Sequence, residues 1–247
     1  MKTEPMKFAT EADLCAAFIA ALGPEWTAYA ETAGWDILLS RKEDACQIGI
    51  QAKLRLNAKV MAQAVESRWA SERPGPDYRA ILVPWDQANE LADLAPYCGL
   101  TVLRVSRRAA YRQTEIYPQL PLPSDLYRSG DDWYEMMPIS RCKLPEYIPD
   151  SVAGSPSPVQ LTRWKIAAMR LCILLDRTGY LVREDFKAQG IDIRRWIGEK
   201  WLQSSAAGFV AGPNLPAFRA NHPRVWGEIE ADENKWRRAA PLMVARG

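Results

Sequence analysis

The sequence predicts an α/β protein in which a mixed sheet flanked by helices is followed by a smaller, mainly helical domain. Residues 1–106 alternate apolar strand-like runs with helical patterns, and strand–helix–strand units imply parallel pairing with helices on the sheet faces. Residues 107–158 are rich in proline but also contain tyrosine and tryptophan, which favours an ordered, irregular connector. Residues 159–247 return to helical periodicity and form the second predicted domain.

The first domain opens with a predicted helix that begins at Thr10, a good N-cap, with Asp13 completing a variant of the capping box. Gly23 and Pro24 end this helix. Short polar segments then join three strands, which is typical of hairpins, before helices and strands alternate. The expected elements are strands at 26–31, 35–40 and 47–54, a helix at 58–69, a strand at 79–84, a helix at 86–94 and a strand at 100–105.

The second domain contains three predicted helices, at residues 161–176, 183–189 and 193–202. Tight turns between helices of this size are typical of a helix-turn-helix module. Glycines, prolines and phenylalanines follow the third helix, and this composition is compatible with a β-wing. In the third helix we expect Ile193, Trp196 and Ile197 to share one apolar face.

The composition restricts the function. No apolar run approaches the roughly 18 residues that would cross a bilayer, and the first ten residues lack a signal core, so we expect a cytoplasmic protein without a membrane partner. The five cysteines are scattered without a CxxC spacing, and His222 is the only histidine. Disulfide frameworks, zinc sites and Ser-His-Asp chemistry are therefore disfavoured. Carboxylates and lysine remain as catalytic groups, together with a hard, oxygen-liganded ion such as Mg²⁺.

The charge is unevenly distributed along the chain. The net charge is +2, yet residues 161–247 contain 15 Lys and Arg against 9 Asp and Glu, so the preceding residues are net acidic. A basic module attached to an acidic one is typical of proteins that hold nucleic acid at the basic end.

The predicted strand at 47–54 carries a polar stripe. Because side chains alternate along a strand, Gln47, Gln51 and Lys53 would point the same way, opposite to a set of apolar residues. Asp36 lies on the preceding strand. An aspartate, a short gap and then a polar-x-Lys pair can lay out a metal-dependent phosphodiesterase site on a sheet.

With these residues, about 8–106 of the chain resembles the PD-(D/E)xK nuclease superfamily, which has the restriction-endonuclease-like fold. The resemblance implies that Asp36 is a metal ligand, that Gln51 occupies the second motif position and also binds the metal, and that Lys53 is the catalytic lysine that assists the attacking water. Gln51 stands where Asp or Glu is usual, as in the variant found in Mrr-like enzymes. The implied cofactor is Mg²⁺ or Mn²⁺.

An amide oxygen can bind Mg²⁺ but contributes no negative charge, so a further carboxylate is expected at this site. Glu11 is in line with Cys15 and Phe18 on the inward face of the first helix, where family members often place a metal-linked glutamate. Glu31, at the end of the first strand, is the other candidate. We favour Glu11 as the additional catalytic and metal-binding residue.

Residues 160–220 resemble a winged helix-turn-helix domain in outline. Arg194 and Arg195 fall off the apolar face of the third helix, where they would enter a major groove or contact phosphates. Arg183 and Lys200 would add contacts to the DNA backbone. The alternative is a solvated basic face on a domain that binds protein.

These features together predict a metal-dependent deoxyribonuclease with a C-terminal DNA-binding domain. Its partner would be DNA, duplex rather than single-stranded, and a homodimer is an alternative to a monomer because duplex cutters often act as dimers. Two other interpretations stay open: a catalytically inactive DNA-binding or regulatory protein that keeps the nuclease fold, and a protein-interaction module.

Overall fold

The computed structural model describes residues 7–66, 73–108, 113–122, 132–150 and 161–237. The chain divides into two compact units, Met1–Gln160 and Leu161–Gly247, which are considered separately. Within the described residues, no helix has the length and apolar character needed to cross a membrane.

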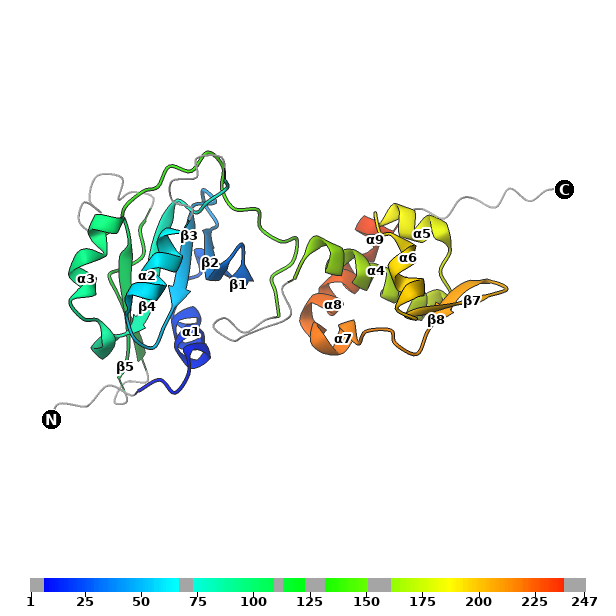
Figure 1. The fold of residues 1–247 in the computed structure, drawn as a ribbon, viewed down its shortest axis with the longest axis horizontal. Helices are drawn as coiled ribbons and strands as arrows, with labels where there is room; N and C mark the ends of the chain where they lie inside the picture. The colour runs from blue at the N-terminus through cyan, green and yellow to red at the C-terminus, as the bar shows by residue number, and fades with distance from the viewer. Residues whose placement is uncertain (1–6, 67–72, 109–112, 123–131, 151–160, 238–247) are drawn as a thin grey trace. The chain divides into compact units, whose positions relative to one another are not determined.

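The first unit is a mixed α/β structure built on a six-stranded sheet (Figure 1). The strands follow one another across the sheet in chain order. The pairs β1–β2 and β2–β3 are antiparallel, β3–β4 and β4–β5 are parallel, and β6 returns antiparallel to β5. The elements are α1 (Glu11–Ala20), β1 (Trp26–Thr32), β2 (Trp35–Arg41), β3 (Gln47–Ala52), α2 (Ala58–Val65), β4 (Tyr78–Pro84), η1 (Trp85–Gln87), α3 (Leu91–Leu94), η2 (Pro96–Cys98), β5 (Thr101–Arg108) and β6 (Gln113–Tyr117). The mixed sheet with helices that the sequence predicts is confirmed at this level.

Two apolar clusters cover the two faces of this sheet. Alternate residues of β4 divide between them: Leu82 belongs to the cluster that contains α1, whereas Ile81 belongs to the cluster that contains α2. Phe18 of α1 and Val60 of α2 are both fully buried in their clusters. Residues of β3 are buried on both faces, which is why this strand reads as a nearly continuous apolar run.

Gly49, in the middle of β3, permits a close approach between the strand and Trp35. A Cβ atom at residue 49 would overlap the indole ring of Trp35. The indole therefore lies directly against the backbone of β3, an arrangement that only glycine allows here.

Three predicted elements differ from the structure of the first unit. The helix expected at 58–69 is described only as far as Val65 and its cap, since residues 67–72 lie outside the described part. The helix expected at 86–94 is replaced by η1 and the short α3, because the Asn89 side chain donates to the Leu56 carbonyl and accepts from the Leu91 N–H, which starts a new turn. The expected irregular connector contains strand β6, which covers the edge of β5.

The second unit begins with three helices, α4 (Arg163–Thr178), α5 (Arg183–Ala188) and α6 (Ile193–Gly198). A hairpin of β7 (Leu202–Ser205) and β8 (Gly208–Ala211) follows, and then α7 (Phe218–Asn221), α8 (Pro223–Ala231) and α9 (Glu233–Trp236). The helix predicted at 193–202 is too long, because Lys200 adopts a left-handed backbone with φ of 56° and the chain then enters β7.

We predict that Gly49→Ala destabilises the first unit strongly, by about 1–3 kcal/mol or more, because the added methyl group must displace the buried Trp35. Urea denaturation followed by circular dichroism measures the effect. Gly227→Ala, in α8 where nothing lies near the new methyl group, is the matched control and should be neutral or stabilising. Equal stability of the two variants would contradict this packing.

Candidate active site

Strand β2 places the carboxylate of Asp36 at the end of β3. Ile37 pairs with Ile50 in the antiparallel register, so the residue before Ile37 lies beside the last residues of β3. There the Asp36 Oδ2 atom accepts a hydrogen bond of 2.7 Å from the N–H of Ala52. The Asp36 side chain thus replaces a backbone carbonyl as the partner of the Ala52 N–H at the point where β2 and β3 separate.

Lys53 comes directly after β3 and is held from both ends. Its N–H donates to the Leu82 carbonyl at 2.9 Å, which continues the pairing between β3 and β4. Its Nζ atom lies 2.7 Å from Glu11 Oε2, in the first turn of α1. The two side chains are 32% and 31% exposed, so solvent reaches the pair.

The start of α1 determines where Glu11 lies. Thr10 and Asp13 form a complete capping box, in which each side chain accepts a hydrogen bond from the backbone N–H of the other residue. This cap fixes the first turn, and the buried Cys15 and Phe18 pack the same helix against the sheet. The carboxylate of Glu11 is therefore presented to Lys53 by a well-defined helix terminus.

The electrostatics show that these groups share one neighbourhood. Burial raises the pKa of Asp36, the Ala52 hydrogen bond and Lys53 lower it, and Glu11 raises it again. The pKa of the Cys15 thiol is raised to about 12 by burial and then by the charges of Asp36, Glu11 and Glu31. Burial and the neighbouring carboxylates therefore favour the protonated thiol at Cys15.

The structure thus brings together Asp36, Lys53 and Glu11, which the sequence places far apart. Of the two glutamates considered, Glu11 makes the direct contact with Lys53, whereas Glu31 acts on Cys15 through its charge.

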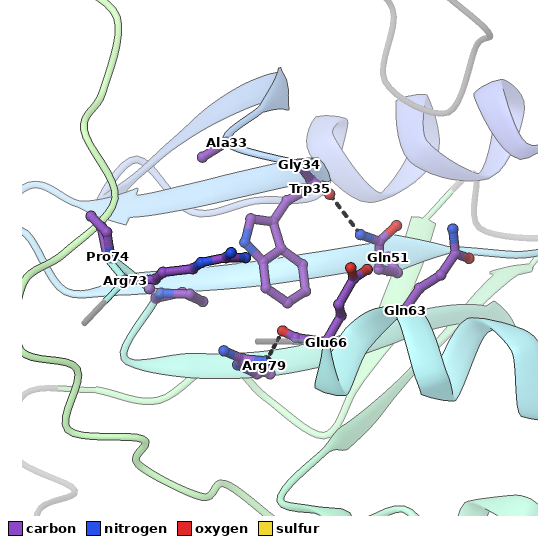
Figure 2. Close-up of a pocket in the computed structure, with 11 residues that line it drawn as sticks. Ala33, Gly34, Trp35, Gln51, Gln63, Glu66, Arg73, Pro74 and Arg79 are labelled. Atoms are coloured by element: carbon purple, nitrogen blue, oxygen red, sulfur yellow. Dashed lines mark hydrogen bonds between the residues drawn. The ribbon is translucent and has the colours of Figure 1, made fainter. Parts of the chain in front are cut away.

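Gln51 lies differently from the prediction. Its Nε2 atom donates to the Gly34 carbonyl at 2.8 Å, and its amide lines a pocket together with Gln63 and Glu66 of the α2 segment (Figure 2). The ammonium of Lys53 contacts α1 instead. The prediction that Gln51 and Lys53 would present their polar groups together is therefore wrong, because β3 ends at Ala52 and Lys53 is free to turn towards α1.

The donor set is compatible with a hard cation. Within the described ranges, no three or more His, Cys, Asp and Glu residues form a cluster that could hold a metal ion. The site offers two carboxylates, Asp36 and Glu11, whereas the amide of Gln51 is turned into the pocket beside Trp35. Mg²⁺ is commonly held by one or two carboxylates, with waters and substrate phosphates completing its octahedron, so this oxygen set fits Mg²⁺ or Mn²⁺.

The basic residues predicted to bind DNA all belong to the second unit. The Arg195 guanidinium lies 5.1 Å from the ring centroid of Trp164 and 5.4 Å from that of Trp201. Arg194 forms an exposed ion pair with the N-cap Asp192. Stacking holds Arg195 in place at low entropic cost, while Arg194 stays at the surface.

The other two basic residues flank this helix. Arg183, at the start of α5, stacks over Phe209 of β8 at 5.8 Å, and Lys200 is exposed in the turn before β7. The apolar face predicted for α6 is only partly correct, because Trp196 is fully buried but Ile197 is 42% exposed.

Several residues around Gln51 escaped the sequence analysis, above all Trp35 and Arg79. The Arg79 guanidinium lies 5.6 Å from the ring centroid of Trp35, and both residues line the pocket beside Gln51. The available signal was Gly49, because a glycine inside a buried strand marks the close approach of another group.

No family model matches the chain, and no curated protein matches it.

We predict that Asp36→Asn stabilises the protein increasingly as pH rises. The raised pKa of Asp36 means that the folded state holds this proton more tightly than the unfolded state, so ionisation of Asp36 opposes folding. This destabilising contribution to the free energy of folding grows as pH rises from the ordinary pKa of Asp to the raised pKa of Asp36 in the folded state. Above that pH it is constant. Asn removes it and can still accept the Ala52 hydrogen bond.

Thermal unfolding of both proteins across this pH range measures the difference, with the exposed Asp93→Asn on α3 as the charge-matched control. A melting-temperature difference that shrinks as pH rises would contradict the assignment.

Proposed function

We propose that the first unit is a metal-dependent nuclease that hydrolyses phosphodiester bonds in DNA, and that the second unit binds the DNA. The observation that carries this proposal is the position of Asp36 at the end of β3, within electrostatic range of the solvent-accessible ion pair between Lys53 and Glu11. The element order of the first unit and the Asp36–Gln51–Lys53 pattern resemble the PD-(D/E)xK superfamily.

Asp36 and Glu11 would hold Mg²⁺ or Mn²⁺ without the amide of Gln51, which lies in the pocket beside Trp35. The bound ion would act as a Lewis acid that polarises the phosphate and lowers the pKa of water. Lys53 would donate hydrogen bonds to the attacking water or to the developing negative charge. The chemistry needs no protein nucleophile, which agrees with the raised pKa of the Cys15 thiol.

The ion pair between Lys53 and Glu11 has a mechanistic role in this proposal. It directs the ammonium to the Glu11 carboxylate and leaves both side chains partly exposed to solvent. A divalent cation would compete with Lys53 for Glu11, so cation binding would release the ammonium towards the substrate.

The second unit supports DNA binding through its order of elements and its charge. Three helices followed by a two-stranded hairpin are the arrangement of winged helix-turn-helix domains, and a bridge between Leu181 and Phe209 adds a third backbone segment to the hairpin. Arg194 and Arg195 extend from α6, the helix that would enter the major groove.

A second candidate is a DNA-binding protein with the nuclease fold but no activity. The observation that favours it is Gln51, whose amide brings no charge and is engaged with the Gly34 carbonyl. Cation affinity would then rest on two carboxylates alone.

Lys53→Ala and Asp36→Ala should each lower DNA cleavage by about 10²-fold or more, because each removes a group that contacts water, metal or phosphate. Purified protein is incubated with plasmid, linear and single-stranded DNA in Mg²⁺, Mn²⁺ or EDTA. The control is Lys42→Ala, which should cut DNA normally. It removes an exposed lysine whose ammonium donates to the Pro24 carbonyl. Cleavage unchanged in both site variants would overturn the site, and DNA binding without cleavage in any metal would favour the second candidate.

Arg194→Ala and Arg195→Ala should each weaken DNA binding at all sequences and reduce the slope of log affinity against log salt by about 1 if each contacts one phosphate. Fluorescence anisotropy with a labelled duplex at several salt concentrations measures both quantities. Arg219→Ala, an exposed arginine on α7, is the charge-matched control. An equal loss of DNA affinity in all three variants would show that only the overall positive charge matters. No DNA binding at low salt would favour a protein-interaction module.

A further inference from the structure

A pocket of about 320 Å³ lies beside Gln51 and on the α2 side of the sheet (Figure 2). It is bounded by the exposed turn between β1 and β2, by the end of α2 and by the segment that leads into β4. Its volume is at the small end of the range for ligand pockets, about 300–1,000 Å³. A single small planar molecule suits it better than a dinucleotide.

Packing and hydrogen bonds hold the side chains of the inner wall of this pocket. Trp35 is held against β3 by the absence of a side chain at Gly49 and is flanked by the Arg79 guanidinium. Arg79 is fixed in turn, because its Nη1 atom donates to the carbonyls of Ala64 and Glu66 at 3.0 and 2.9 Å. Gln51 is fixed by its hydrogen bond to Gly34. Walls that are ordered before binding lose little entropy when a ligand enters.

The outer rim carries polar groups of both charges. Figure 2 shows Gln51, Gln63 and Glu66 on one side of the Trp35 indole and Arg73 on the other. Gln63, Glu66 and Arg73 are all exposed. The rim offers amide donors and acceptors, a carboxylate acceptor and guanidinium donors around an aromatic wall.

These groups select for a neutral planar ligand. The carboxylate of Glu66 lines the pocket together with the guanidinium groups of Arg73 and Arg79, so the lining carries both charges and is not a purely basic phosphate site. A nucleobase presents donors and acceptors in one plane, which amides, carboxylates and guanidinium groups match. The acceptors on the Gln51 side favour a base with an exocyclic amino group, which thymine lacks.

We propose that this pocket receives one nucleobase turned out of the DNA, with preference for adenine, cytosine or guanine over thymine. The inference rests on the proposed function, because it takes the substrate to be nucleic acid. Gln51 connects the two sites: its backbone is adjacent to the Asp36–Ala52 hydrogen bond, and its side chain lines the pocket.

The same geometry explains the amide at Gln51. A carboxylate at this position would repel the phosphates of an approaching strand and could not donate to Gly34 or to a base. Glutamine can donate both to Gly34 and to a base. The residue that weakens the metal site therefore contributes to the pocket. Turning a base out of a duplex costs a few kcal/mol, which hydrogen bonds in the pocket would offset.

The test measures binding without metal, using the full chain in EDTA and the four free deoxynucleosides, which carry no phosphate. NMR titration should show saturable binding of deoxyadenosine, deoxycytidine or deoxyguanosine, with thymidine weakest. Gln63→Ala and Glu66→Gln should each weaken this binding by about tenfold, which corresponds to about 1.4 kcal/mol. Gln203→Ala, an exposed glutamine on β7, is the matched control and should bind as the unmodified chain does.

A second measurement uses a duplex that contains 2-aminopurine, whose fluorescence rises when it leaves the base stack. The unmodified chain and Gln203→Ala should raise the fluorescence, and Gln63→Ala should raise it less. No saturable binding of any deoxynucleoside, no effect of either pocket variant, or thymidine binding as tightly as the others would overturn the proposal. Deoxynucleoside binding without DNA cleavage would overturn the nuclease alone, whereas cleavage without such binding would overturn the pocket alone.

Discussion

Strand β3 is the constraint on which the first unit depends. It pairs antiparallel with β2 and in parallel with β4, and all six of its residues are buried. This double pairing fixes the register that brings the Asp36 carboxylate to the N–H of Ala52 and the N–H of Lys53 to the Leu82 carbonyl. A shift of one residue would turn every side chain of the strand to the opposite face and separate the polar groups.

The candidate site stands at the end of β3 and places charge where the sheet would otherwise be apolar. Burial and Glu11 raise the pKa of Asp36, and the nearby Lys53 only partly offsets them. A carboxylate whose ionised form is disfavoured in this way lowers the stability of the fold. The backbone of Gln51 belongs to strand β3, whereas its amide lies in a pocket that Trp35 and Arg79 also line.

Much of the fold could be predicted from local patterns. The capping box at Thr10, the alternating strands and the glycine and proline stops reproduce the order from α1 to β5, because each depends on residues close in sequence. The errors have tertiary causes. Strand β6 exists because β5 offers an edge to pair with, α3 is shortened by the contact between Asn89 and Leu56, and α6 ends early where Lys200 turns the chain into a hairpin.

By itself the sequence determined which chemistry is available: a chain with one histidine and scattered cysteines, an aspartate, a Gln-x-Lys pair and a basic C-terminal third. Only the tertiary structure decided which of these groups meet. It joined Glu11 to Lys53 and directed Gln51 away from that pair towards Trp35. The reason is physical, since contacts between residues far apart in the chain depend on strand register, helix packing and the point where a strand ends, none of which local periodicity specifies.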